Sequence, residues 1–285
     1  MNKSDINWLH VELSSKCNAW CPACPRNKFG FGLVDGLIEE DLSLEKLEQV
    51  LKQLPNLTAV QLCGNYGDPI AAANIIPAID IIKKYASKIQ IHTNGSLRNT
   101  TWWKNLANQL STINHDVWFG IDGLEGVHEI YRQGTSYTKI ISNAQAFINN
   151  GGYATWQFIP YKHNEHQVKD CIRLSQKLKF KQFKLIKLFR NKISVRHYQT
   201  GDSFELLPPE EFQHIIRIPK TNTQISESNC MHLTQPSIYM SASGALSHCC
   251  YKSKYSSEHL FDTVDELLYN SANLQDKVCL NSCGT

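Results

Sequence analysis

The sequence predicts an α/β fold with a mainly parallel sheet, followed by a small cysteine-rich segment. Six strand-like segments alternate with segments of helical periodicity through the first 190 residues. Beyond that point the regular apolar periodicity fades. Five of the ten cysteines then fall between residue 230 and residue 283. Strands that alternate with helices favour parallel pairing, because each helix provides the crossover between two strands.

The expected elements follow one another without a long gap. Residues 8–13 alternate polar and apolar side chains and predict the first strand. Residues 44–54 show helical spacing, and Ser43 is placed to act as the N-cap of that helix. The other expected strands are 57–62, 88–92, 117–121, 153–159 and 183–188, and the other expected helices are 75–85, 101–111, 137–148 and 165–178.

Three cysteines lie directly after the first expected strand. Cys17, Cys21 and Cys24 have the spacing C-x3-C-x2-C, which offers three thiolates from one loop. A structural zinc site uses four protein ligands, whereas a 4Fe-4S cluster held by three thiolates keeps one iron open to another ligand. The alternatives are a zinc site completed by a distant fourth ligand, or three unrelated thiols.

This spacing, in a loop after a first strand, resembles the signature of the radical S-adenosylmethionine (SAM) superfamily. The resemblance implies a partial (β/α)6 parallel barrel with its chemistry on the loops at the carboxyl ends of the strands. It also implies a 4Fe-4S cluster on Cys17, Cys21 and Cys24, whose open iron binds SAM. In that family an electron donor such as flavodoxin or ferredoxin reduces the cluster, and SAM is cleaved to a 5'-deoxyadenosyl radical that abstracts hydrogen from a substrate.

Further motifs follow successive strands in the order that the family requires. After the second strand, residues 64–69 resemble a Gly-Gly-Glu-Pro motif whose carbonyls and acidic side chain receive the SAM amino group. The resemblance assigns this role to Gly64, Gly67, Asp68 and Pro69. Asp68 replaces the usual glutamate and is one methylene shorter.

The next two loops supply the remaining expected SAM contacts. Thr93 and Asn94 resemble a segment near the SAM ribose or the substrate. Asp122 and Arg132 resemble a Ser-x-Asp-Gly stretch with a following arginine, whose guanidinium suits the methionine carboxylate. One position departs from the family pattern, because Ala23 stands where an aromatic side chain often packs on adenine. We consider Trp20 or a later aromatic residue as its replacement.

The second cysteine group indicates a branch of the family. Cys230, Gly244 and Cys249 match the opening C-x9-15-G-x4-C pattern of SPASM and Twitch domains, but five cysteines are too few for the two clusters of a full SPASM domain. The resemblance therefore implies a Twitch-like domain with one auxiliary 4Fe-4S cluster. Its ligands would be Cys230, Cys249, Cys279 and Cys283. Cys250 is left out, because adjacent residues on a strand point to opposite faces. A four-cysteine zinc knuckle is the alternative.

These patterns predict three segments: a radical SAM partial barrel at 1–190, a bridging segment at 191–229 and an auxiliary cluster domain at 230–285. The net charge of +3, with scattered Lys and Arg, does not favour nucleic acid binding. No apolar run is long enough to span a membrane, and the first residues lack an apolar signal region. We therefore expect a cytoplasmic protein.

The leading functional hypothesis is a radical SAM oxidoreductase that oxidises or rearranges a small polar metabolite, with the auxiliary cluster as electron acceptor. The polar side chains near expected strand ends are Asn94, Asp122, Tyr161, His163, Asn164 and Lys187. The second hypothesis is a peptide-modifying enzyme. The early first strand, which leaves no room for an N-terminal peptide-recognition module, counts against it. The third is a zinc-stabilised binding protein without catalysis, which would not explain the glycine-rich loops after successive strands.

Overall fold

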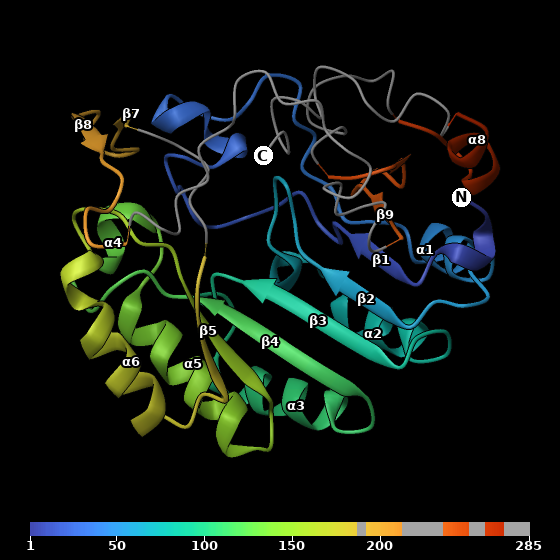
Figure 1. The fold of residues 1–285 in the computed structure, drawn as a ribbon, viewed down its shortest axis with the longest axis horizontal. Coiled ribbons are helices and arrows are strands. Elements are labelled where there is room, and N and C mark those ends of the chain that lie inside the picture. Colours follow the sequence, from blue (N-terminus) through green and yellow to red (C-terminus); the bar gives the residue numbers. More distant parts are fainter. Residues whose placement is uncertain (187–191, 213–235, 251–259, 271–285) are drawn as a thin grey trace. The chain divides into compact units, whose positions relative to one another are not determined.

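The computed structural model describes residues 1–186, 192–212, 236–250 and 260–270. The chain divides into two compact units. The first unit comprises Met1–Ser15, Glu39–Gln90 and Pro219–Thr285, and the second comprises Lys16–Ile38 and Ile91–Ile218. Both units are α/β, as Figure 1 shows.

In the first unit the strand order is β10-β9-β1-β2. Strand β1 (Trp8–Val11) pairs in parallel with both β2 (Ala59–Leu62) and β9 (Ser237–Met240), and β10 (Leu246–Ser247) returns antiparallel to β9. The helices of this unit are α1 (Leu44–Leu51), α2 (Ile75–Ile82) and α8 (Val264–Tyr269), with the 3-10 turns η1 (Lys3–Asp5) and η3 (Pro69–Ala71).

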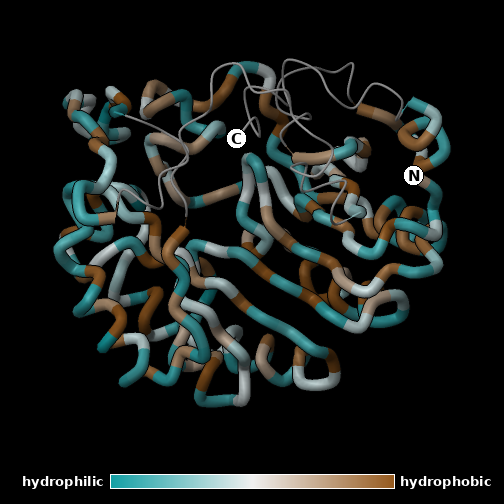
Figure 2. Tube along the Cα trace, in the orientation of Figure 1, coloured by the Kyte–Doolittle hydropathy of each residue, from teal (hydrophilic) through white to brown (hydrophobic). Residues whose placement is uncertain are grey.

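The N-terminal part of this unit follows the alternation of its sequence. Leu9 and Val11 are fully buried, and His10 between them faces the other side of the strand. Ser43 caps α1 as expected, because its hydroxyl accepts a hydrogen bond from the Lys46 N–H at 3.4 Å. The chain then runs through β3 (Lys88–Thr93), which alternates buried and partly buried residues and leads into the second unit. Figure 2 shows the hydropathy of the residues along the same trace.

In the second unit β4 (Asn114–Gly120), β5 (Ala154–Phe158) and β6 (Gln182–Leu185) pair in parallel in that order. The helices are α3 (Thr100–Leu110), α4 (His128–Tyr131), α5 (Tyr137–Asn149) and α6 (Val168–Lys177), with the 3-10 turns η2 (Pro25–Gly30) and η4 (Glu165–Gln167). Helix α5 contacts α3 and β5, while α6 contacts β6 (Figure 1). The core is aromatic, with Trp103, Phe119, Phe147 and Trp156 fully buried.

An antiparallel hairpin of β7 (Ile193–Arg196) and β8 (Ser203–Leu206) completes the second unit. It lies in the segment that the sequence predicted only as a bridge. The sequence does contain the pattern of a β-hairpin, because apolar residues alternate at 193 and 195 and again at 204 and 206, with Gly201 between them.

The predicted fold class is confirmed as α/β with parallel strands, and each of the six expected strands forms at its expected place. Closure into a partial barrel and the segment boundaries at 190 and 230 stay predictions. Cys230, Cys279, Cys283 and Lys187 lie outside the described residues. Among the described helices, none is long and apolar enough to cross a membrane.

Candidate metal centre and cofactor site

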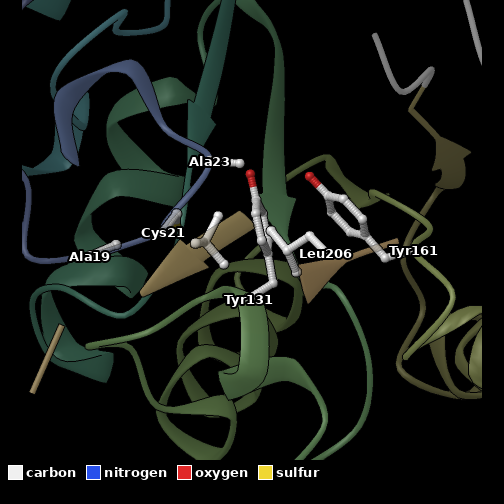
Figure 3. Close-up of a cluster of buried hydrophobic side chains, with 7 residues drawn as sticks. Ala19, Cys21, Ala23, Tyr131, Tyr161 and Leu206 are labelled. Carbon is white, nitrogen blue, oxygen red and sulfur yellow. The ribbon is translucent and has the colours of Figure 1, made fainter. Parts of the chain in front are cut away.

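The three-cysteine loop lies in the second unit and packs against an apolar cluster. We call this cluster the cysteine-loop core. Its buried members are Ala19, Cys21, Ala23, Tyr131, Tyr161, Val195 and Leu206. Cys17 and Cys24 are partly buried against it. Figure 3 shows Tyr131 between Cys21 and Tyr161, with both phenol groups directed the same way. The Cys21 thiol is therefore buried in an apolar environment, and Cys17 and Cys24 lie at its edge.

Nitrogen donors lie near the sulfur atoms of Cys17 and Cys21. The Cys17 Sγ accepts from the Ala19 N–H at 3.3 Å and from Asn94 Nδ2 at 3.7 Å. The Cys21 Sγ lies 4.0 Å from Arg132 Nη1. Such donors stabilise a thiolate more than a thiol, because the negative sulfur is the better acceptor.

The donor chemistry of this loop fits an iron–sulfur cluster. Cys17, Cys21 and Cys24 bring three thiol groups to one loop. A cubane cluster offers a different iron to each thiolate. That these three cysteines hold such a cluster stays a prediction.

Asp122 and Arg132 form a buried ion pair beside Cys21. The Asp122 carboxylate is fully buried and accepts from Arg132 Nε at 2.6 Å and from the Ile159 N–H at 2.6 Å. Gly120 leaves room for the guanidinium, because a side chain there would meet Arg132 Nη2. Burial disfavours the charge on Arg132, but Asp122 and Cys21 outweigh this effect and raise the pKa of Arg132 well above its usual range. Arg132 therefore stays charged next to the cysteine loop.

The same surroundings shift the pKa values of Cys21 and His128. Burial raises the pKa of the Cys21 thiol to about 11, although Arg132 acts in the opposite direction. Burial and the charge of Arg132 lower the pKa of His128 to about 3. His128 is thus a neutral imidazole whose Nδ1 accepts from the Asp122 N–H at 3.1 Å. Its other ring nitrogen lies 3.0 Å from the Thr135 hydroxyl.

The loop after β3 is tied to the cysteine loop through Asn94. Asn94 Nδ2 donates to Asn18 Oδ1 at 2.9 Å, and Asn18 Nδ2 donates to the Ser96 hydroxyl at 2.7 Å. The Thr93 hydroxyl accepts from the Gly95 N–H at 3.0 Å. Asn94 thus supports the position of Cys17, in addition to the ribose or substrate role that the resemblance implies.

The loop of residues 64–69 lies in the first unit, after β2. Asp68 caps the turn η3, because its Oδ1 accepts from the Ile70 N–H at 2.9 Å, and the buried Pro69 occupies the first position of that turn. Gly64 and Gly67 are required by packing, since a side chain on Gly64 would overlap the Gly67 backbone and one on Gly67 would overlap the Ser14 carbonyl. The backbone that leads to the cysteine loop therefore lies directly against Gly67.

The β7–β8 hairpin covers part of the cysteine loop, which the sequence did not predict. Trp20 stacks on Tyr198 with ring centroids 5.4 Å apart and planes within 5°. Gln133 joins the same two residues, since its carbonyl accepts from the Trp20 N–H at 2.7 Å and its Oε1 accepts from the Tyr198 N–H at 3.0 Å. Trp20, considered as the replacement for an aromatic at Ala23, therefore packs on the hairpin.

Of the second cysteine group, the described residues contain Cys249 and Cys250, both partly exposed. They follow β10 in the first unit. The Cys250 carbonyl accepts from Asn65 Nδ2 at 2.8 Å, and this bond joins the C-terminal hairpin to the loop of residues 64–69.

No protein-family model and no curated protein sequence matches this chain. Solved structures with the same fold do exist. Streptococcus suis SuiB bound to S-adenosylmethionine aligns with a TM-score of 0.62 and 12% identity over 87% of this chain, which spans 61% of the SuiB chain. Native anSMEcpe with bound AdoMet aligns with a TM-score of 0.64 and 16% identity, covering 92% of this chain and 80% of that one.

At such low identity the likeness establishes the fold alone. The fold is that of proteins whose crystals contain S-adenosylmethionine. Two further structures show SuiB bound to the precursor peptide SuiA and anSMEcpe with AdoMet and a peptide. This chain shares that fold and carries three cysteines in the loop after β1.

Proposed function

We propose that this protein is a radical SAM enzyme. The observation that carries the proposal is the cysteine loop: three cysteines after β1, two of them with nitrogen donors near their sulfur atoms, in a fold shared with SAM-bound proteins. The cluster and SAM together would supply reductive cleavage to a 5'-deoxyadenosyl radical that abstracts hydrogen from the substrate. The protein holds and orients these groups and keeps water away from them.

The residues divide these tasks between them. Cys17, Cys21 and Cys24 hold the cluster. Asn94 and Arg132 support two of the ligand sulfurs through their nitrogen donors. The SAM contacts that the resemblance assigns are Gly64, Gly67, Asp68, Pro69, Thr93, Asn94, Asp122 and Arg132. Asp122 accepts from Arg132 Nε, and Arg132 Nη1 faces Cys21 Sγ, so Nη2 is the nitrogen that would bind a SAM carboxylate.

For the substrate we propose a small polar metabolite that is oxidised or rearranged, with an auxiliary 4Fe-4S cluster on Cys230, Cys249, Cys279 and Cys283 as electron acceptor. The support is the number and spacing of the C-terminal cysteines. An electron donor such as flavodoxin or ferredoxin would reduce the SAM-binding cluster. A peptide substrate is the second candidate, and the peptide complexes of the two structural neighbours favour it.

The first experiment is to measure iron, sulfide and zinc in anaerobically reconstituted protein. Two clusters predict about eight irons per chain and negligible zinc. About four irons would leave the SAM-binding cluster and remove the auxiliary one. A zinc-loaded protein without iron would support the binding-protein hypothesis instead.

The second experiment is to measure 5'-deoxyadenosine formed from SAM with dithionite as reductant. Cys17→Ala is expected to abolish it. Cys171→Ala is the matched control, because this thiol is fully buried in the same unit but lies on α6 and not on the loop. Cleavage stimulated by pooled polar metabolites, but not by a peptide encoded by a neighbouring gene, would favour the metabolite. The reverse would favour the peptide.

A further inference from the structure

We propose that Glu12 is the positioning residue of the SAM-binding loop and that Tyr239, from the C-terminal part of the chain, holds Glu12 in place. The inference rests on the proposed function, because the resemblance assigns residues 64–69 to SAM. It adds two residues from other segments of the chain, neither of which the motifs assign a role.

Glu12 lies one residue beyond β1 and is 2% exposed. Its Oε1 accepts from the Tyr66 N–H at 2.6 Å and from the Gly67 N–H at 2.9 Å, and its Oε2 accepts from the Tyr239 hydroxyl at 2.6 Å. A buried carboxylate is tolerated only when its oxygens are hydrogen-bonded. Here three donors converge on one side chain, and two of them belong to the loop.

The hydrogen bonds from the Tyr66 and Gly67 N–H groups to Glu12 set the orientation of the two peptide groups. In a trans peptide the N–H and the C=O point in opposite directions. When the Tyr66 and Gly67 N–H groups turn toward Glu12, the carbonyls of Asn65 and Tyr66 must turn away from it. A backbone carbonyl can accept two hydrogen bonds, so both are suited to an ammonium group. Glu12 thus selects the carbonyls that the loop presents to the SAM amino group.

Strand β9 fixes Glu12 from the other side. The Glu12 N–H donates to the Met240 carbonyl at 2.8 Å, which continues the β1–β9 pairing past the end of β1. His10 lies two residues before Glu12 and so on the same face of the strand. Its ring packs edge-on against Tyr239 with centroids 5.0 Å apart, and its Nε2 lies 2.6 Å from the Cys63 carbonyl. The ends of β1, β2 and β9 therefore hold the loop together.

A second hydrogen bond also joins the loop of residues 64–69 to the C-terminal part of the chain. Asn65 Nδ2 donates to the Cys250 carbonyl at 2.8 Å, so the end of the β9–β10 hairpin also contacts the loop. The C-terminal segment is thus connected both to Glu12, through Tyr239, and to the loop itself, through Cys250.

The test compares Glu12→Ala, Glu12→Gln and Tyr239→Phe in reconstituted full-length protein. Tyr85→Phe is the matched control, because the Tyr85 hydroxyl also donates to a glutamate, Glu48, at 3.0 Å in the same unit. One readout is the equilibrium affinity for SAM. The other is hydrogen–deuterium exchange of the Tyr66 and Gly67 amides in the apoprotein, which does not depend on the cluster or on SAM.

Removing one hydrogen bond to a charged group is expected to weaken SAM binding about tenfold in Tyr239→Phe, and more in Glu12→Ala. Glu12→Gln should restore affinity to within about threefold of wild type, because its amide oxygen accepts from both N–H groups and its NH₂ group can donate to Tyr239. Amide exchange should follow the same order. Tyr85→Phe should change neither readout.

The proposal is overturned if Glu12→Gln is as impaired as Glu12→Ala, or if Tyr239→Phe matches Tyr85→Phe in both readouts. If the wild-type protein does not bind SAM while the amide exchange follows the expected order, the proposed function fails. The role of Glu12 in holding the loop then stands on its own.

Discussion

Acidification is expected to destabilise this protein through His128. The structure holds this ring neutral, with a pKa lowered to about 3 by burial and by the charge of Arg132, compared with 6.5 in an unperturbed histidine. The unfolded chain therefore takes up the proton first. The contribution to stability is complete above about pH 6.5 and is lost as the pH falls toward 3. At about 1.4 kcal/mol per pH unit, the free energy of unfolding should fall by about 2 kcal/mol between pH 7.5 and pH 5.

The assay is urea unfolding of the reduced apoprotein at pH 7.5 and pH 5.0, for wild type and His128→Asn. The asparagine amide oxygen can accept from the Asp122 N–H as Nδ1 does. Comparing the two pH values within each protein removes the constant cost of the substitution. His163, whose pKa burial lowers to about 4, adds pH dependence of the same sign to both proteins. The reasoning is refuted if His128→Asn shows the same pH dependence as wild type.

Three other substitutions or probes test the site. Gly67→Ala places a methyl group on the Ser14 carbonyl, so the loop must move and SAM affinity should fall at least tenfold; unchanged affinity would contradict the packing. Arg132→Gln leaves the Asp122 carboxylate buried without its partner and should lower the free energy of unfolding by about 3–5 kcal/mol in urea titration, whereas a loss below about 1 kcal/mol would argue against the ion pair. In the apoprotein at pH 7.5, a Cys21 pKa of about 11 implies a thiolate fraction about a hundredfold below that of an ordinary thiol. Mass spectrometry should therefore find slow alkylation of Cys21 that accelerates with rising pH, and fast alkylation at pH 7.5 would contradict this burial.

Local patterns in the sequence were sufficient for the first strand and for the cap of the first helix. Alternation of side chains places β1 directly before Cys17, Cys21 and Cys24, whose role as a set of ligands stays a prediction. Ser43 shows the same principle for a cap, because the residue and its helix are adjacent in the chain. Such features need no knowledge of distant partners.

The residues that sequence reasoning missed depend on distant partners. In the first strand, His10 and Glu12 occupy the polar positions of the alternation, which predicts exposure to solvent. They are instead covered by Tyr239, which only the return of β9 brings beside β1. In the same way, the position of Trp20 depends on Tyr198. The spacing of the cysteines does not predict the hairpin that carries Tyr198.

The parallel pairing of β1 and β9 also sets an order of events during synthesis. The hydrogen bond between Glu12 and Tyr239 joins residues 227 positions apart. At ribosomal rates of about 5–20 residues per second, Tyr239 is made on the order of 10–45 s after Glu12. For that interval one edge of β1 has no partner strand, and such an edge is prone to aggregation. The three cysteines are already made by then, so they precede the contact of Tyr239 with Glu12 that fixes the loop of residues 64–69.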